Sequence, residues 1–301
     1  MAKGAARKRK TSKQVAQSPG CKPLKDAYEE AVRVKPTSWD QVQDTFLRAM
    51  ELFDRNVEGG RTDWGDRQNG KGDFFNDLLA LILEKCADVE LLSRSGVPGF
   101  VFPSHNLDVT YPATGIVQFL LEAKAVGIPK HPGNPKQKNP LGRDGSADLP
   151  KRIKEGAFKT IDLKSEYARM QSMVGKGPKG GPGGDLTTWL RSSKPLSYLF
   201  IAARVTSTRD HNALLNLAHA AHQVWDRVGV FSFRPVSEDK PTTYEALSVP
   251  RDIELAAVLF SACQDLINVP PVEEVEAPPG PAEEAASLID EEELEAAEED
   301  E

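Results

Sequence analysis

Apolar residues recur every three or four positions in several stretches of the chain, a spacing typical of helices with one buried face. A capping box at 38–41 predicts the start of the first helix. The buried stripe of this helix is Trp39, Val42, Phe46, Met50 and Phe53, and that of the second is Phe74, Phe75, Leu78, Leu79, Ile82 and Cys86. A Gly-rich, charged loop is expected between them over 58–72, and later helices are expected over 149–174, 210–228 and 253–267.

Shorter apolar runs between turn residues predict strands. These runs are 97–102, 106–111, 116–126, 196–205 and 228–233. A Pro-Ala-Thr-Gly turn at 112–115 joins the second and third runs into a hairpin. From the second helix onward the order is helix, three strands, helix, strand, helix, strand, followed by the last helix. This order predicts an α/β fold.

Charge is concentrated at the two ends of the chain. Residues 1–25 contain 8 Lys/Arg and no Asp/Glu, and residues 271–301 contain 14 Asp/Glu and no Lys/Arg. Both segments lack an apolar pattern, which predicts a disordered basic arm and a disordered acidic tail. A single domain is expected over 26–270, with basic loop insertions at 127–147 and 175–195.

The net charge of −7 hides a basic region inside the domain. Residues 124–179 hold 13 basic and 5 acidic side chains, an excess that favours a polyanionic partner such as nucleic acid. No apolar run approaches the roughly 20 residues that span a bilayer, so no membrane partner is expected. Cys21, Cys86 and Cys263 lie far apart, which argues against a disulfide framework and a structural zinc site, and we expect a cytoplasmic location.

Two carboxylates and a lysine coincide with the predicted hairpin. Glu122 and Lys124 are two positions apart, so they share one face of a strand whose other face is apolar. Asp108 lies on the preceding strand and faces Glu122 across the hairpin. Ionisable groups that end a buried strand are costly unless a metal, a partner charge or a substrate compensates them. The set suits metal-assisted hydrolysis of a phosphodiester.

Spacing alone does not single out this set. Asp148 with Asp162 and Lys164 has the same spacing, but 149–174 follows a helical period, and residues two apart on a helix do not share a face. Glu238-Asp239-Lys240 lies between turn residues, with no strand predicted to carry it. The secondary structure therefore favours the set at Asp108.

With the order of elements, these residues resemble the PD-(D/E)xK nuclease superfamily, whose best-known members are type II restriction endonucleases. The match covers about 70–235 and rests on Leu107-Asp108 and Leu121-Glu122-Ala123-Lys124. Leu107 stands where the family pattern has proline. The resemblance implies a restriction-endonuclease-like core with a central mixed β-sheet flanked by helices.

The resemblance also implies roles for these residues. Asp108, Glu122 and the backbone carbonyl of Ala123 would bind Mg²⁺, and Lys124 would orient or deprotonate the attacking water. Mg²⁺ prefers hard oxygen ligands and keeps several waters, so two carboxylates are enough protein anchoring. Family members often add an acid from the preceding helix, where Asp73 and Asp77 are candidates; the alternative is that both cap that helix.

Several residues in predicted loops are candidates for contact with DNA. The segment 65–71 mimics a phosphate-binding loop, but Gly72 replaces the required Ser or Thr, so no nucleotide cofactor is expected. We expect either an approach loop, whose Arg67, Asn69 and Lys71 touch the DNA backbone, or a plain connector. The insertions supply Lys130, Lys136, Lys138, Arg143, Lys176 and Lys179 as further DNA contacts, with solvated loops as the alternative.

The expected function is a Mg²⁺-dependent endonuclease of the restriction type that cuts double-stranded DNA. Cutting both strands usually requires two active sites, which favours a homodimer. One alternative is another nuclease of the same superfamily, with a role in repair, recombination or phage DNA processing. Another is a noncatalytic nucleic-acid-binding protein.

Overall fold

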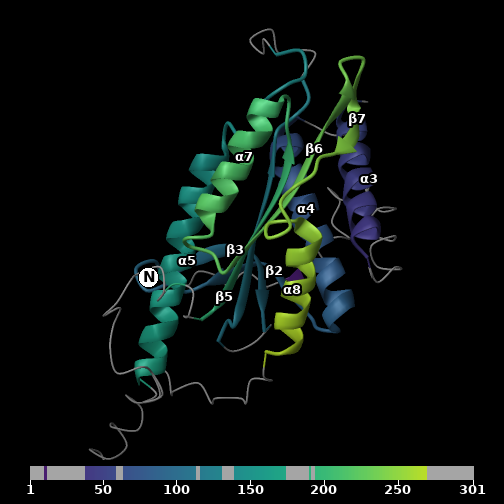
Figure 1. Cartoon of the computed structure of the whole chain (residues 1–301). Helices are drawn as coiled ribbons and strands as arrows, with labels where there is room; N and C mark the ends of the chain where they lie inside the picture. The colour runs from purple at the N-terminus through teal and green to yellow at the C-terminus, as the bar shows by residue number, and fades with distance from the viewer. Residues whose placement is uncertain are drawn as a thin grey trace, which may run out of the picture. The chain divides into compact units, whose positions relative to one another are not determined.

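A seven-stranded mixed sheet forms the centre of the protein in the computed structural model (Figure 1). The strands follow the chain in order: β1 (Lys10–Thr11), β2 (Leu92–Val97), β3 (His105–Tyr111), β4 (Phe119–Val126), β5 (Leu196–Arg204), β6 (Arg227–Ser237) and β7 (Lys240–Ala246). Strands β1 to β4 are antiparallel neighbours, β4, β5 and β6 are parallel, and β7 is antiparallel to β6.

The structure describes residues 10–11, 38–58, 64–112, 116–130, 139–173, 190 and 194–269. The chain divides into two units, Met1–Val269 and Pro270–Glu301, and all described residues belong to the first. The predicted tail at 271–301 lies outside them, as does the predicted arm at 1–25 apart from Lys10 and Thr11. These two residues pair with β2.

Five helices cover the two faces of the sheet in the described part of the chain. Figure 1 shows α3 (Trp39–Glu58), α4 (Trp64–Ala87) and α8 (Leu255–Ile267) on one side, and α5 (Leu149–Met173) and α7 (Thr208–Ala221) on the other. Helix α5 connects β4 to β5 and α7 connects β5 to β6, as parallel neighbours require a crossover. The predicted α/β fold, with a central mixed sheet flanked by helices, is confirmed.

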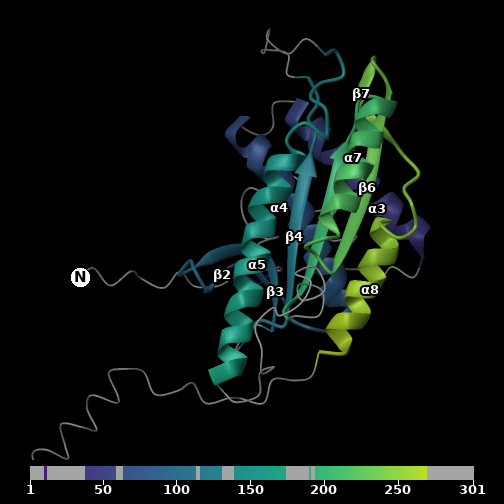
Figure 2. The ribbon, with the colours of Figure 1, turned by 60° about the vertical axis from the view of Figure 1, so that its left-hand side comes forward.

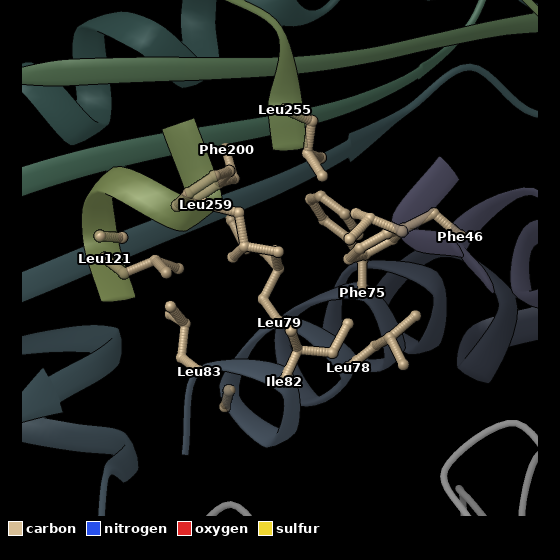
Figure 3. Packing of buried hydrophobic residues seen from close by; sticks show 14 of the residues in the cluster. Phe46, Phe75, Leu78, Leu79, Ile82, Leu83, Leu121, Phe200, Leu255 and Leu259 are labelled. Carbon is tan, nitrogen blue, oxygen red and sulfur yellow. The ribbon is translucent and has the colours of Figure 1, made fainter. Parts of the chain in front are cut away.

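The two faces of β4 separate the core into two parts. Phe119, Leu121 and Ala123 point toward α4 and α8, in the larger hydrophobic cluster. Figure 3 shows Leu121 and Phe200 from the sheet beside Leu255 and Leu259 of α8, with the apolar face of α4 opposite them. Because strand side chains alternate between faces, Glu122 and Lys124 are directed to the other side, where α5 lies.

Four details differ from the predictions. The helix predicted over 210–228 ends at Ala221, and β6 begins at Arg227. The segment 97–102 is not a strand, because Pro98 and Gly99 end β2 and leave Phe100 to Phe102 in a loop. The predicted loop at 58–72 is wrong from Trp64 onward, where α4 begins despite its glycines. Strand β7 was not predicted: it returns from the turn at Glu238 and Asp239 and pairs with β6.

Candidate active site

The candidate site lies where β3 and β4 separate. The two strands pair Tyr111 with Phe119, Thr110 with Leu120 and Val109 with Leu121. The next residue on each strand is one of the predicted acids, and β4 continues to Val126 along β5. In the described part of the hairpin, the β3-facing edge of β4 therefore has no strand partner beyond Leu121.

The side chain of Asp108 occupies this unpaired edge. Its Oδ2 accepts a hydrogen bond of 2.8 Å from the backbone N–H of Ala123 and one of 3.2 Å from Nζ of Lys124. From the opposite face, Nδ2 of Asn76 on α4 donates to the backbone carbonyl of Asp108 at 3.1 Å. Strand and helix together fix the position of this carboxylate.

Lys124 joins the two acids. Its Nζ lies 2.5 Å from Oε2 of Glu122 and 3.2 Å from Oδ2 of Asp108. The structure thus brings together the three residues that the hairpin and the strand period predict. Their roles in catalysis stay predictions.

The environment holds the lysine in its charged form. Burial lowers the pKa of Lys124, but the carboxylates of Asp108 and Glu122 more than offset this, so that the pKa is raised above its ordinary value. The side chain of Glu122 is 1% exposed and that of Lys124 is 17% exposed. The site therefore contains a buried carboxylate that depends on nearby positive charge.

Lys159 on α5 is a further member of the site that the sequence did not reveal. Its Nζ lies 3.2 Å from Oε1 of Glu122 and donates to the backbone carbonyl of Asn106 at 2.8 Å. Figure 2 shows α5 along β4 on this side of the sheet. Each oxygen of the Glu122 carboxylate thus contacts a different ammonium group. No spacing distinguishes Lys159 from the other lysines of α5.

The oxygen atoms of the site suit a hard divalent cation. The N–H and C=O of one strand residue point to the same neighbour, so the carbonyl of Ala123 is directed to the side of β3, as its N–H is. The Asp108 carboxylate and this carbonyl lie at the strand edge, and the Glu122 carboxylate lies on the adjoining face of β4, linked to Asp108 through Lys124. This donor set fits Mg²⁺, which needs few protein oxygens and keeps several waters.

Asp73 and Asp77 are engaged elsewhere. Arg94 lies 3.3 Å from Asp73 and 3.0 Å from Asp77, and its pKa is raised because these two carboxylates outweigh the effect of burial. Among the residues whose positions are described, no group of three or more His, Cys, Asp and Glu side chains could hold a metal ion. Neither aspartate therefore joins Asp108 and Glu122 in such a group.

One predicted DNA contact is wrong. Lys71 lies in α4 with its side chain 3% exposed, and its Nζ contacts Asp54 at 2.7 Å. An ammonium group buried in an ion pair cannot touch a DNA backbone. Arg67 and Asn69 also belong to α4 and not to a loop, but their side chains lie outside the described part.

The other predicted DNA contacts are only partly described. Lys130 is exposed, and Arg143 is 51% exposed beside Asp148. Both belong to the insertion after β4, where Arg143 pairs with Ile128 through an isolated β-bridge. Lys136, Lys138, Lys176 and Lys179 lie outside the described residues.

The second set with the same spacing is scattered. Asp162 accepts hydrogen bonds from the backbone N–H groups of Val101 and Phe102 and lies 2.7 Å from Nε2 of His105. Lys164 contacts Asp226 at 2.8 Å. Asp148 is paired with Arg143 at the start of α5. The helical interpretation of this segment is confirmed.

Comparisons with protein-family models, with curated proteins and with solved structures find no match to this chain. No helix in the described part is long and apolar enough to cross a membrane. The function is therefore inferred from the geometry of the site.

Proposed function

We propose that this protein is a Mg²⁺-dependent endonuclease that cuts double-stranded DNA at specific sites, as type II restriction endonucleases do. The observation that supports this best is the position of Lys124, whose ammonium contacts both Asp108 and the buried Glu122 at the point where β3 and β4 separate. The order of α4, the strands β2 to β4, the crossover helix α5 and the parallel strand β5 also agrees with the PD-(D/E)xK resemblance.

In this proposal Asp108, Glu122 and the carbonyl of Ala123 would hold Mg²⁺. When bound, the ion would neutralise charge on the phosphoryl oxygens and lower the pKa of a bound water. Lys124 has a raised pKa in this structure, so it carries its proton. In this form it would orient the attacking water by donating a hydrogen bond, whereas Mg²⁺ on the same two carboxylates would oppose the rise of its pKa. Removing a proton from that water would require the neutral amine.

Two further residues position the ligands. Lys159 contacts Oε1 of Glu122 and fixes the orientation of that carboxylate, and Asn76 holds the backbone at Asp108. Groups that orient metal ligands are part of how a metal site is tuned. Because cutting both strands of a duplex usually requires two such sites, the proposal includes a homodimer.

The substitution Lys124→Ala tests the proposal. We expect the rate of Mg²⁺-dependent plasmid cleavage to fall by about 100-fold or more, the range for a group that stabilises developing charge or assists proton transfer. Discrete product bands from the wild-type protein would indicate recognition of specific sites. Lys85→Ala serves as the matched control, because Lys85 is an exposed lysine on α4.

Full activity in Lys124→Ala, with a circular dichroism spectrum like that of the wild type, would contradict the assignment of the site. DNA binding that persists in EDTA, with no cleavage under any metal condition, would favour the noncatalytic nucleic-acid-binding alternative. Irregular products from all DNA substrates would instead favour a nuclease of repair, recombination or phage DNA processing.

A further inference from the structure

Four large apolar side chains are exposed together beside the candidate site. Phe100, Val101, Phe102 and Phe158, which we call the apolar patch, are 57%, 66%, 49% and 46% exposed. Only two other large apolar residues in the described part are as exposed, Val236 and Ile267. Phe102 and Phe158 contact edge to face, with ring centroids 5.4 Å apart. Contiguous exposed apolar surface marks interaction sites.

Hydrogen bonds to Asp162 of α5 hold the loop that carries the patch. The buried carboxylate of Asp162 accepts hydrogen bonds from the backbone N–H groups of Val101 and Phe102, at 2.8 and 3.2 Å. It also contacts His105, whose ring lies 5.8 Å from that of Phe102. A Cβ at Gly99 would lie 2.1 Å from Oδ2 of Asp162, so a larger residue there would displace this carboxylate. The patch is presented by a braced loop.

The patch adjoins the candidate site through neighbouring residues of two elements. On α5, Phe158 belongs to the patch and Lys159 contacts Glu122. On β3, His105 contacts the rings of the patch, and the next residue, Asn106, accepts a hydrogen bond from Lys159. The patch and the candidate site therefore meet at adjacent residues of α5 and of β3.

The charges around the patch identify the class of molecule that fits it. Lys154 is exposed on α5 one turn before Phe158. Lys151 and Arg152, nearer the start of the helix, are also exposed but pair with Glu155 at 3.8 and 3.5 Å. Positive charge next to exposed aromatic rings is the combination that binds nucleic-acid strands, with phosphates on the basic groups and bases on the rings. Apolar side chains can also enter between base steps and unstack them.

We propose that the apolar patch contacts bases of DNA bound at the candidate site, with Phe102 stacking on a base that leaves the duplex stack beside the cleaved phosphodiester and Phe158 contacting the edge of that base. This inference rests on the proposed nuclease function, since it places the substrate at Glu122. It adds a base contact to a site that otherwise contacts only phosphate.

The test measures binding of the full chain to labelled oligonucleotides by fluorescence anisotropy, in EDTA. The probes are a short mixed-sequence single strand and a strand of the same length built from abasic sites. We expect Phe102→Ala to weaken binding to the normal strand by about tenfold, within the range for loss of one stacked base. Binding to the abasic strand is expected to be unchanged, and Phe102→Tyr is expected to bind the normal strand as the wild type does.

Val236→Ala and Ile267→Ala are the matched controls, because they remove equally exposed apolar side chains elsewhere. Phe100→Ala provides a second variant within the patch and is expected to weaken binding in the same way. Equal affinity of the wild type, Phe102→Ala and Phe100→Ala for the normal strand would overturn the inference. So would an equal loss on both strands, because that loss would not depend on bases.

A second copy of the chain could cover the apolar patch in place of DNA. Light scattering on the same samples tests this alternative. If Phe102→Ala converts a dimer to a monomer without changing DNA affinity, the patch is a subunit interface and the inference is wrong. A parallel cleavage assay in Mg²⁺ separates the two proposals. If the protein cleaves DNA but Phe102→Ala does not change DNA binding, the base contact is wrong and the nuclease proposal stands. If Phe102→Ala weakens binding only to the strand with bases but no cleavage occurs, the nuclease proposal is wrong and the base contact stands.

Discussion

Two motifs in this chain have the same order and spacing of an acid, a second acid and a lysine, but they lie in different secondary structure. The strand motif is Asp108, Glu122 and Lys124, and the helix motif is Asp148, Asp162 and Lys164. In the strand motif the lysine contacts both acids. In the helix motif each residue contacts a different part of the protein.

The difference follows from the periods of the two structures. Residues two apart lie on the same face of a strand but on different sides of a helix. Lys124 is therefore directed to Glu122, whereas Lys164 is directed to Asp226 and Asp162 to the loop before β3. Residue types and spacing alone do not define a site. The backbone that carries them decides whether they serve chemistry or stability.

The largest expected effect is on stability, in the helix motif. Lys164 is fully buried, and its pKa is lowered by burial although Asp226 opposes the shift. Removing one partner of a buried ion pair leaves the other charge uncompensated, so we expect Lys164→Ala to reduce the free energy of unfolding by about 3 kcal/mol or more. Urea unfolding followed by circular dichroism measures this change.

The comparison with Lys124→Ala makes that measurement informative. Lys164→Ala is expected to cleave DNA normally in the fraction that stays folded, while Lys124→Ala is expected to lose cleavage with a smaller change in stability. An unfolding free energy equal to that of the wild type in Lys164→Ala would contradict the structural role assigned to the helix motif.

The strand motif could be predicted because its signals are local. The Pro-Ala-Thr-Gly turn at 112–115 sets two strands side by side, and the alternation along β4 aligns Glu122 with Lys124. Lys159 could not be found in this way, because it reaches the site from the crossover helix through tertiary packing. Its position depends on how α5 lies across β4, which no single segment of sequence encodes.

The errors in the fold have a similar cause. Strand β2 was missed because its buried positions include Ser93 and Ser95, whose burial becomes favourable only in the sheet, where Ser95 hydrogen-bonds to Thr110 at 2.7 Å. The run from Phe100 to Phe102 was predicted to be a strand because it is apolar, yet it is exposed in a loop. Apolar character indicates burial on average, and exceptions of this kind occur at interaction surfaces.

An intermediate effect is expected when the second acid of each motif is replaced and the stabilisation of the protein by Mg²⁺ is measured. A ligand that binds only the folded protein stabilises it, by about 1.4 kcal/mol at ten times its Kd. We expect Mg²⁺ to stabilise the wild-type protein in this way and Glu122→Gln to lose the response, because a neutral amide is a poor substitute for a carboxylate ligand. Thermal unfolding with increasing Mg²⁺ concentration measures the shift.

Asp162→Asn is the matched control for Glu122→Gln. It replaces the corresponding acid of the helix motif, which accepts hydrogen bonds from Val101 and Phe102. We expect Asp162→Asn to lower the stability of the protein but to keep the full response to Mg²⁺. Equal responses in wild type and Glu122→Gln would show that Glu122 does not bind the metal.

The smallest expected effect belongs to Lys159, which lies on the helix but serves the strand motif. Its side chain is 28% exposed and contacts Glu122, so it acts as a positioning residue for that carboxylate. We expect Lys159→Met to lower kcat for DNA cleavage by a few-fold to about tenfold, at or below the low end of the range for groups that orient metal ligands. Lys159→Arg is expected to restore most of the rate, since a guanidinium can also hydrogen-bond to the carboxylate. Restoration of kcat by arginine would distinguish a positioning role from a packing role. The exposed Lys85 gives the control variant Lys85→Met. Equal kcat values for Lys159→Met, Lys85→Met and the wild type would exclude Lys159 from the site.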